Sequence, residues 1–130
     1  MNYLLDTCAL LHYSLQPDRL SVFALEEITN SANQVWLSVI SAGELACLQN
    51  KGRIEFRSHW KIWFRDAVER SGWEPLPITQ EIMEEAYSLP EPIHRDPADR
   101  LLIATSRIHR MPLVTTDSLI LNYPHVESLA

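Results

Sequence analysis

Short apolar runs that end in a polar residue recur along the chain. Residues 3–6 ("YLLD"), 35–38 ("VWLS") and 112–116 ("PLVTT") share this pattern. Runs of this length and composition are typical of strands that are buried on both faces of a parallel sheet. A fourth run, residues 73–78 ("WEPLPI"), contains two prolines, which confine a strand to a sheet edge because proline has no amide hydrogen to donate. The pattern therefore predicts four strands, one of them at an edge.

Between these runs, apolar residues recur at spacings of three and four, which predicts helices with one apolar face. Each predicted helix opens near a Ser, Thr or Asp that can cap its N-terminus. The predicted helices span residues 21–29, 41–49, 58–70, 79–89 and 97–109. The alternation of strands and helices predicts an α/β fold with a largely parallel sheet.

One broad apolar stripe stands out in and just before the third predicted helix. It consists of Phe56, Trp60, Trp63, Phe64 and Ala67. We expect this stripe to pack on the core or on a partner protein, because large apolar side chains at helical spacing bury one face of a helix.

Length and composition agree with a single compact domain over residues 1–130. The chain has 130 residues, of which 46% are hydrophobic and 22% charged, as is usual for a globular protein. No segment approaches the roughly 18 uninterrupted apolar residues of a membrane span. The first residues, "MNYLLDTCALLHY", have no basic region and carry an aspartate inside the apolar run, unlike a signal peptide. We therefore expect a cytoplasmic protein with no membrane partner.

The cysteines and the net charge narrow the chemistry further. Cys8 and Cys47 lie in apolar segments, where a reducing compartment favours small buried thiols over a disulfide. A structural zinc site is disfavoured because the chain has neither a C-x-x-C motif nor a histidine pair at ligand spacing. The net charge of −6 argues against a broad basic surface for nucleic acid. A nucleic-acid substrate would need another source of positive charge.

Four acidic residues come at the ends of predicted strands or near the starts of predicted helices. They are Asp6, Glu44, Asp99 and Asp117. Ligands of open parallel sheets bind beyond the carboxyl ends of the strands, so all four can face one edge of the sheet. Each acid alone also fits a local role, because a strand-end aspartate often forms the next turn and a first-turn glutamate complements the helix dipole.

The four acids taken together indicate a function that none of them indicates alone. Two unit charges about 4 Å apart repel each other by about 4 kcal/mol at an effective dielectric constant of about 20. A divalent cation would offset this repulsion, and ligands that are all oxygen favour Mg²⁺ or Mn²⁺. Such an ion lowers the pKa of a bound water and neutralises charge on a phosphoryl group. The predicted reaction class is metal-dependent hydrolysis of a phosphoester.

Two aspartates near the start of the last predicted helix are given different roles. Asp96 precedes Pro97, which fits an N-cap followed by the first helical residue. Asp99 falls at the third helical position, where a capping box more often has a glutamate that reaches back. The shorter aspartate is freer to point toward the sheet edge. We predict that Asp96 is the cap and Asp99 the metal ligand.

Four segments together resemble the motifs of PIN-domain proteins, in particular the VapC-like toxins of bacterial type II toxin–antitoxin systems. They are "LLDTCALLH", "LSVISAGELA", "HRDPADRLLIATS" and "LVTTDSLILNYPHV", in the order and at about the spacing of that family. The resemblance runs over nearly the whole chain. It implies a PIN domain with a three-layer sandwich in which helices flank a central, mainly parallel sheet. It also implies a Mg²⁺- or Mn²⁺-dependent endoribonuclease that leaves a 5′-phosphate and a 3′-hydroxyl.

The resemblance assigns roles one position at a time. Asp6 is similar to the first metal-binding aspartate of the family, and Glu44 to the glutamate in the helix after the second strand. Asp99 is similar to the third acid, and Asp117 to a fourth position that is less constant. These four are the expected catalytic and metal-binding residues. The expected supporting residues of the pocket are Ser38, Thr115, Thr116 and Asp96.

Partners are also implied. RNA must approach an acidic pocket, and Arg95 and Arg100 flank the acids, so we expect both to contact RNA. His94 fits a capping or surface position as well as a base. Toxins of this family usually form homodimers and are inhibited by a small antitoxin whose C-terminal segment lies in a groove of the toxin. We therefore expect an RNA substrate, a cognate antitoxin and a homodimer.

Three other interpretations remain open from the sequence. A phosphatase of the haloacid dehalogenase type would have a second acid two residues after Asp6, where this chain has Cys8. A phosphoacceptor receiver domain would have adjacent acids after the first strand and a late lysine, and no lysine follows Lys61. A non-catalytic PIN-like module that binds RNA or protein would lack one of the main acids, and none is missing.

Overall fold

A fully parallel five-stranded sheet forms the centre of the molecule. The structure is a computed structural model that describes residues 1–56, 58–92 and 96–130. The strand order is β3-β2-β1-β4-β5, and every pairing is parallel. The strands are β1 (Asn2–Leu5), β2 (Gln34–Ser38), β3 (Glu74–Leu76), β4 (Leu113–Val114) and β5 (Ser128–Leu129).

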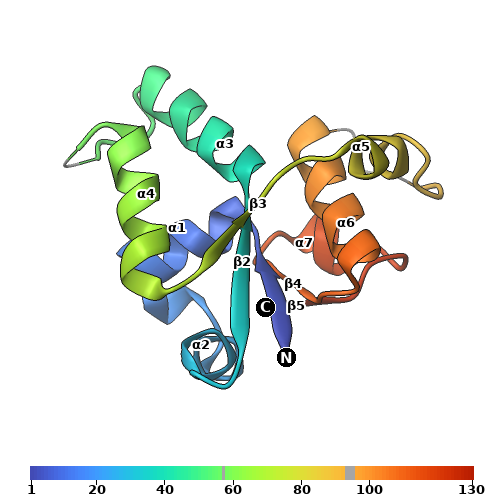
Figure 1. The fold of residues 1–130 in the computed structure, drawn as a ribbon, viewed down its shortest axis with the longest axis horizontal. Helices are drawn as coiled ribbons and strands as arrows, with labels where there is room; N and C mark the ends of the chain where they lie inside the picture. The colour runs from blue at the N-terminus through green and yellow to red at the C-terminus, as the bar shows by residue number, and fades with distance from the viewer. Residues whose placement is uncertain (57, 93–95) are drawn as a thin grey trace.

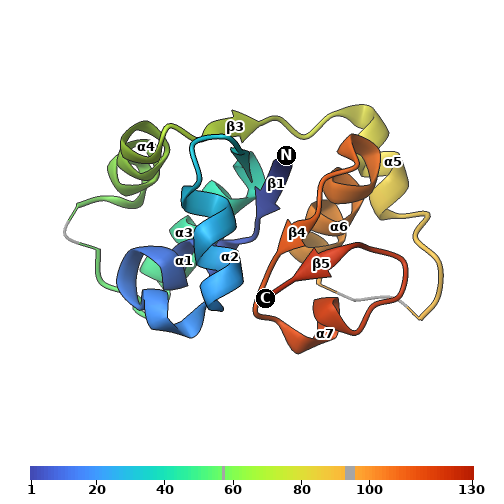
Figure 2. The same ribbon diagram turned by 90° about the horizontal axis from the view of Figure 1, so that it is seen from below.

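Helices cover both faces of this sheet, which confirms the predicted three-layer sandwich. Figures 1 and 2 show α1 to α4 on one side of the sheet and α5 to α7 on the other. The first group comprises α1 (Thr7–Leu15), the short 3₁₀ helix η1 (Pro17–Arg19), α2 (Val22–Thr29), α3 (Val39–Asn50) and α4 (Trp60–Ser71). The second group comprises α5 (Gln80–Ala86), α6 (Pro97–His109) and α7 (Ser118–Leu121).

Successive residues of the central strands supply two separate cores. Because side chains alternate along a strand, Tyr3 and Leu5 of β1 pack into the core beneath α1 to α4, whereas Leu4 packs into the core beneath α6. The same alternation sends Val114 to the first core and Leu113 to the second. Burial on both faces explains why these strands read as continuous apolar runs.

Most predicted elements are present, with shifted ends. The strand with two prolines lies at a sheet edge as predicted. The helix predicted for residues 41–49 begins earlier, at Val39, because the Ser38 hydroxyl accepts a hydrogen bond from the amide of Ile40 and caps the helix there. The helix predicted for residues 79–89 ends at Ala86. Four of the described elements were not predicted: α1, η1, α7 and β5.

The strand order reverses between β1 and β4. The connections from β1 through β2 to β3 move along the sheet in one direction, and β4 then pairs with the other side of β1. The two strands are joined by hydrogen bonds from the Leu4 amide to the Pro112 carbonyl and from the Asp6 amide to the Val114 carbonyl, each 3.0 Å. Open α/β sheets form their ligand sites at such a reversal. The carboxyl ends of β1 and β4 are therefore the place to search for a functional site.

One sequence-based expectation is wrong. Cys8 and Cys47 are free thiols, but both are exposed and not buried. Cys8 lies in the first turn of α1 and Cys47 in the third turn of α3, on helix faces that the core does not cover. Within the described parts of the chain, no helix is long and apolar enough to cross a membrane.

Truncating Leu102 should strongly destabilise the fold. This α6 side chain is 1% exposed and packs against the sheet near Leu4 and Leu113. We expect Leu102→Ala to lower the free energy of unfolding by about 3 kcal/mol, because it removes buried methyl groups and leaves a cavity. Urea unfolding measures the change. The control is Leu119→Ala, where the leucine is 64% exposed, and an equal loss in both variants would contradict the assigned packing.

Candidate active site

Asp6 lies at the point where the strand order reverses. It follows β1 directly and caps α1, and its Oδ1 accepts a hydrogen bond of 2.7 Å from the amide of Ala9. Its other oxygen, Oδ2, accepts from the hydroxyl of Thr115 at the end of β4. The side chain is only 3% exposed. Two neighbouring elements thus fix one carboxylate at the carboxyl edge of the sheet.

Burial and charge both act on this carboxylate. Loss of solvent raises the pKa of Asp6 to about 6, and the negative charges of Glu44 and Asp117 add to that rise. The hydrogen bonds from Thr115 and Ala9 act in the opposite direction, because they stabilise the ionised form. The local capping role expected for a strand-end aspartate is therefore real, but it does not account for the second hydrogen bond or for the nearby acids.

Glu44 reaches the same edge from α3. Because α3 begins at Val39, Glu44 lies in the second turn, beyond the first turn where a glutamate complements the helix dipole. Its Oε1 accepts a hydrogen bond from the hydroxyl of Thr7, the first residue of α1. Burial raises the pKa of Glu44, Thr7 lowers it, and the charge of Asp96 raises it. Glu44 is therefore coupled both to α1 and to the start of α6.

The two aspartates at the start of α6 occupy the positions that the sequence predicts. Asp96 is the N-cap, and its Oδ1 accepts from the amides of Ala98 at 2.8 Å and Asp99 at 3.2 Å. Asp99 is the third residue of the helix and is half-buried. Burial and then the charges of Asp96, Asp117, Glu44 and Asp6 raise the pKa of Asp99 to about 7. The negative charges of four other acids therefore act on the Asp99 carboxylate.

Asp117, the fourth acid, lies between β4 and α7. It caps α7, where its Oδ1 accepts from the amide of Leu119 at 2.9 Å. Its own amide donates to Thr115 Oγ1 at 3.0 Å. Thr115 thus connects Asp6 to the backbone of Asp117. The neighbouring Thr116 has a different contact, with Oγ1 3.2 Å from Nδ1 of His12.

The negative charges of all four acids act on the thiol of Cys8. Although Cys8 is exposed as a residue, partial loss of solvent around its sulfur raises its pKa to about 12, and the charges of Asp6, Glu44, Asp117 and Asp99 add to that rise. The four residues proposed from the sequence therefore act together on one point beside the first turn of α1.

The donor atoms fit a hard divalent cation, although the side chains do not yet enclose one. All four acids offer carboxylate oxygens, the ligands that Mg²⁺ and Mn²⁺ prefer. Burial, and after it the charges of nearby acids, raise the pKa values of two of them, Asp6 and Asp99. Within residues 1–56, 58–92 and 96–130, no three His, Cys, Asp or Glu side chains already form a group that could hold a metal ion.

Basic side chains near the acids are few among the described residues. Arg95, expected to contact RNA, and His94 lie outside the described residues. The guanidinium of Arg100 lies 5.2 Å from the ring centre of Tyr87, the C-cap residue of α5, and Tyr87 is 58% exposed. Arg107 instead stabilises the fold, because it pairs with Glu85 at 2.9 Å and donates to the His125 carbonyl at 2.6 Å.

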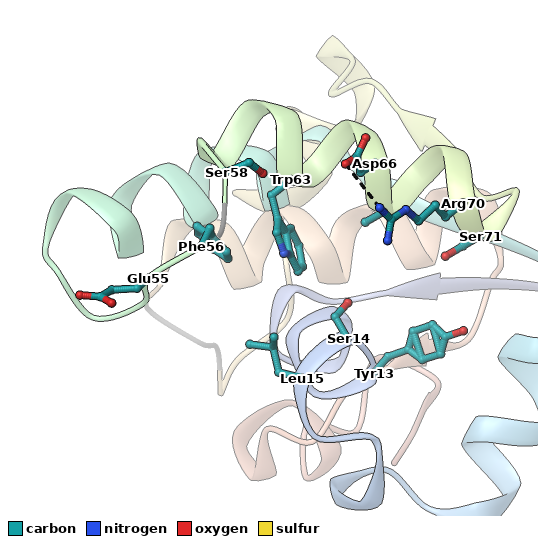
Figure 3. A pocket seen from close by; sticks show the side chains of 11 residues that line it. Tyr13, Ser14, Leu15, Glu55, Phe56, Ser58, Trp63, Asp66, Arg70 and Ser71 are labelled. Carbon is teal, nitrogen blue, oxygen red and sulfur yellow. Dashed lines mark ion pairs between the residues drawn. The ribbon is translucent and has the colours of Figure 1, made fainter.

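A groove at the C-terminal end of α1 contains none of the four acids. It has a volume of about 680 Å³ and lies between α1 and α4, as Figure 3 shows. The predicted aromatic stripe supplies part of its wall, because Trp63 points from α4 toward Leu15 of α1. Phe64 of the same stripe is instead 8% exposed and belongs to the core. An ion pair of 4.0 Å between Asp66 and Arg70 lies along the α4 side.

Two hydroxyl residues of the site were not predicted from the sequence, and a third has an additional role as a helix cap. Thr7 and Ser41 lie beside Glu44, 5% and 0% exposed. The only available signal for Thr7 is its place directly after Asp6 at a predicted strand end. Ser38, expected to line the pocket, ends β2 and caps α3 with its side chain.

Comparison with known proteins gives a family and a fold. The PIN domain family matches residues 3–125. Ribonuclease VapC22 of Mycobacterium tuberculosis is 33% identical over 122 residues, which cover 94% of this chain and 92% of that protein.

Two solved structures share the fold. The first is a structure of VapBC2 from Rickettsia felis bound to a DNA fragment from the VapBC2 promoter. One chain of it matches this protein with a TM-score of 0.72 and 16% identity, and the match covers 99% of this chain and 98% of that chain. In a toxin–antitoxin complex from Klebsiella pneumoniae the TM-score is 0.67 and the identity 21%, with 98% and 96% covered. At these identities the structural matches establish the fold alone.

Proposed function

The chain belongs to the PIN domain family, and from that premise we propose that it is a metal-dependent endoribonuclease, the toxin of a type II toxin–antitoxin pair. One observation supports the proposal: in a chain related to a named ribonuclease, the charges of Asp6, Glu44, Asp99 and Asp117 all act on Cys8, near the point where the strand order reverses. Asp6, Glu44 and Asp99 would hold Mg²⁺ or Mn²⁺, and Asp117 would add a fourth carboxylate.

The chain's own residues set up this site before substrate binds. Thr115 fixes Asp6 from β4, and Thr7 fixes Glu44 from α1. Asp96 caps α6 and so fixes the first turn of the helix that carries Asp99. When bound, the divalent ion supplies a water of lowered pKa and neutralises charge on the phosphoryl oxygens. Preorganised carboxylates reduce the cost of arranging the reacting groups.

The proposed RNA substrate and antitoxin partner rest on the similarity to a ribonuclease and to toxin–antitoxin complexes, and charge and shape indicate how each would bind. With a net charge of −6, the chain depends on the bound cation and on local basic residues to attract an RNA backbone. Arg95 and Arg100 flank the acids in sequence and are the proposed RNA contacts. The groove between α1 and α4 is the proposed place for the antitoxin segment, because the aromatic part of its otherwise mixed wall can bury apolar side chains. A homodimer remains a prediction.

Removal of metal tests the proposed activity. We expect purified full-length protein to cut structured RNA with Mg²⁺ or Mn²⁺, and excess EDTA to slow cleavage at least about 100-fold, since the ion activates the water. Added Mn²⁺ should restore the rate. Gel analysis of end-labelled RNA measures cleavage and the end groups of the products.

A pair of variants separates this activity from a contaminating nuclease. Glu44→Gln should be strongly impaired, whereas Glu81→Gln, the same change at an exposed glutamate of α5, should cut like the unaltered protein. Cleavage that persists in EDTA, or that is equal in both variants, would overturn the proposal. A non-catalytic PIN-like module would bind RNA in the same assay without cutting it.

A further inference from the structure

Two buried hydroxyl groups connect the start of α1 to the second turn of α3. Thr7 Oγ1 lies 2.9 Å from Ser41 Oγ and donates to Oε1 of Glu44. Thr7 is 5% exposed and Ser41 is fully buried. Ser41 precedes Glu44 by three residues, so both side chains lie on the same face of α3. The contact therefore joins two elements through one carboxylate.

The number of hydrogens fixes the direction of this chain of hydrogen bonds. A hydroxyl has one hydrogen to donate and can accept two. An ionised carboxylate can only accept, so the Thr7 hydrogen is directed to Glu44, and Thr7 Oγ1 accepts from Ser41. A charged acceptor makes the bond from Thr7 stronger than one between two neutral groups. Ser41 in turn restricts the rotation of the Thr7 hydroxyl.

We propose that Thr7, supported by Ser41, is a positioning residue for Glu44. It fixes Oε1 and leaves Oε2, which has no hydrogen-bond partner among the described residues, for a divalent cation. This inference rests on the proposed function and deepens it, because it names the group that orients one of the proposed ligands. A glutamate side chain that is held in one rotamer loses less conformational entropy when it binds an ion.

The sequence position of Thr7 gives this role a structural logic. Thr7 follows Asp6 directly, so the first turn of α1 places one carboxylate through its N-cap and orients a second through a hydroxyl. Asp6 is itself held by a threonine from another element, Thr115. Each of the two carboxylates is thus fixed by a neutral donor that leaves its charge intact. A cationic partner at either place would compete with a bound metal ion.

Three threonine variants isolate the hydroxyl. Thr7→Val keeps the shape of the side chain but removes the donor, whereas Thr7→Ser keeps the donor. The matched control is Thr105→Val on α6, where a threonine that is 1% exposed loses its bond to the Leu101 carbonyl of the same helix. All three variants are made in the full chain and checked by thermal melting.

The first readout is Mn²⁺ affinity, measured by the electron paramagnetic resonance of free Mn²⁺ without any RNA. We expect Thr7→Val to weaken binding about 10- to 100-fold, the usual effect of removing a group that orients a metal ligand. Thr7→Ser should recover most of this loss, and Thr105→Val should bind like the unaltered protein. Ser41→Ala should give a smaller loss in the same direction, and it replaces Thr7→Val if that variant does not fold.

A double-mutant cycle with Glu44→Ala tests whether Thr7 acts through Glu44. Without the glutamate, Thr7→Val should change Mn²⁺ affinity less than about twofold, because the orienting bond is already absent. Equal losses in both backgrounds, or an unchanged affinity of Thr7→Val, would overturn the positioning role while leaving the nuclease proposal intact. If the unaltered protein neither binds Mn²⁺ nor cuts RNA, the proposed function itself is wrong.

Discussion

Replacing Asp99 by asparagine is expected to reduce RNA cleavage at least about 1000-fold, because a proposed metal ligand loses its charge. Burial, followed by the charges of Asp96, Asp117, Glu44 and Asp6, raises the pKa of Asp99 to about 7. Removing that charge relieves repulsion in the metal-free protein, so the variant should fold at least as stably as the unaltered chain. Cleavage of end-labelled RNA and thermal melting measure the two properties.

The matched control changes the neighbouring acid in the same way. Asparagine is as good an N-cap as aspartate, so Asp96→Asn should keep the hydrogen bonds to the amides of Ala98 and Asp99. We expect its free energy of unfolding to change by less than about 0.5 kcal/mol, since the cap is kept, and its cleavage activity to remain substantial. If Asp96→Asn proved as inactive as Asp99→Asn, the division into a cap and a ligand would be wrong.

The elements that the sequence predicts well are those with local causes. The helix predicted for residues 97–109 has the observed bounds, because Asp96 and Pro97 define its start and an apolar face runs along it. The strand at residues 74–76 lies at a sheet edge, as predicted, because Pro75 has no amide hydrogen to donate to a further strand. In both places a few adjacent residues decide the structure.

The elements that were missed depend on distant partners or on an ambiguous pattern. Strand β5 has two residues and exists through its pairing with β4, where the amides of Leu113 and Thr115 donate to the carbonyls of Glu127 and Leu129 at 2.9 Å. Helix α1 continues an apolar run that begins in β1, so no period separates the two elements. The boundary is set by Asp6, which ends the strand and caps the helix.

The candidate site divides in the same way. Its four acids can be proposed from their places at element ends, because the parallel sheet brings those ends to one edge. The hydroxyl donors to Asp6 and Glu44 cannot, since Thr115 is 109 residues from Asp6 and Thr7 is 37 residues from Glu44. Only the folded chain pairs a hydroxyl with each of these carboxylates. The resemblance named threonines at positions 115 and 116 together, and the structure assigns the contact with Asp6 to Thr115.

The buried charge of Asp6 should make the metal-free protein less stable as the pH rises. Its pKa is raised to about 6 in the folded chain, above the value of about 3.9 for an unperturbed aspartate. Between these values the folded state binds more protons than the unfolded state, so the free energy of unfolding falls with increasing pH. The stabilisation is complete below the lower value and is lost as the pH passes through the higher one.

Because Asp6 is 3% exposed, the loss is expected to be large. A rise of about two pKa units corresponds to about 3 kcal/mol, of which about 2 kcal/mol should appear between about pH 4 and about pH 7.5. Asp6→Asn does not ionise, so its stability should fall with pH by that much less. Urea unfolding in EDTA at both pH values measures the difference, and Asp18→Asn, at an exposed aspartate of η1, should keep the unaltered slope.

Added metal reverses this dependence if Asp6 is a ligand. An ion that binds only the folded state raises the free energy of unfolding with its concentration. Mn²⁺ at about pH 7.5 should therefore restore to the unaltered protein much of the stability that the ionised carboxylate removes, with far less effect on Asp6→Asn, which lacks the charge that binds the ion. Equal stabilisation of both proteins by Mn²⁺ would place the ion away from Asp6. A pH slope that Asp6→Asn leaves unchanged would show that other groups cause it.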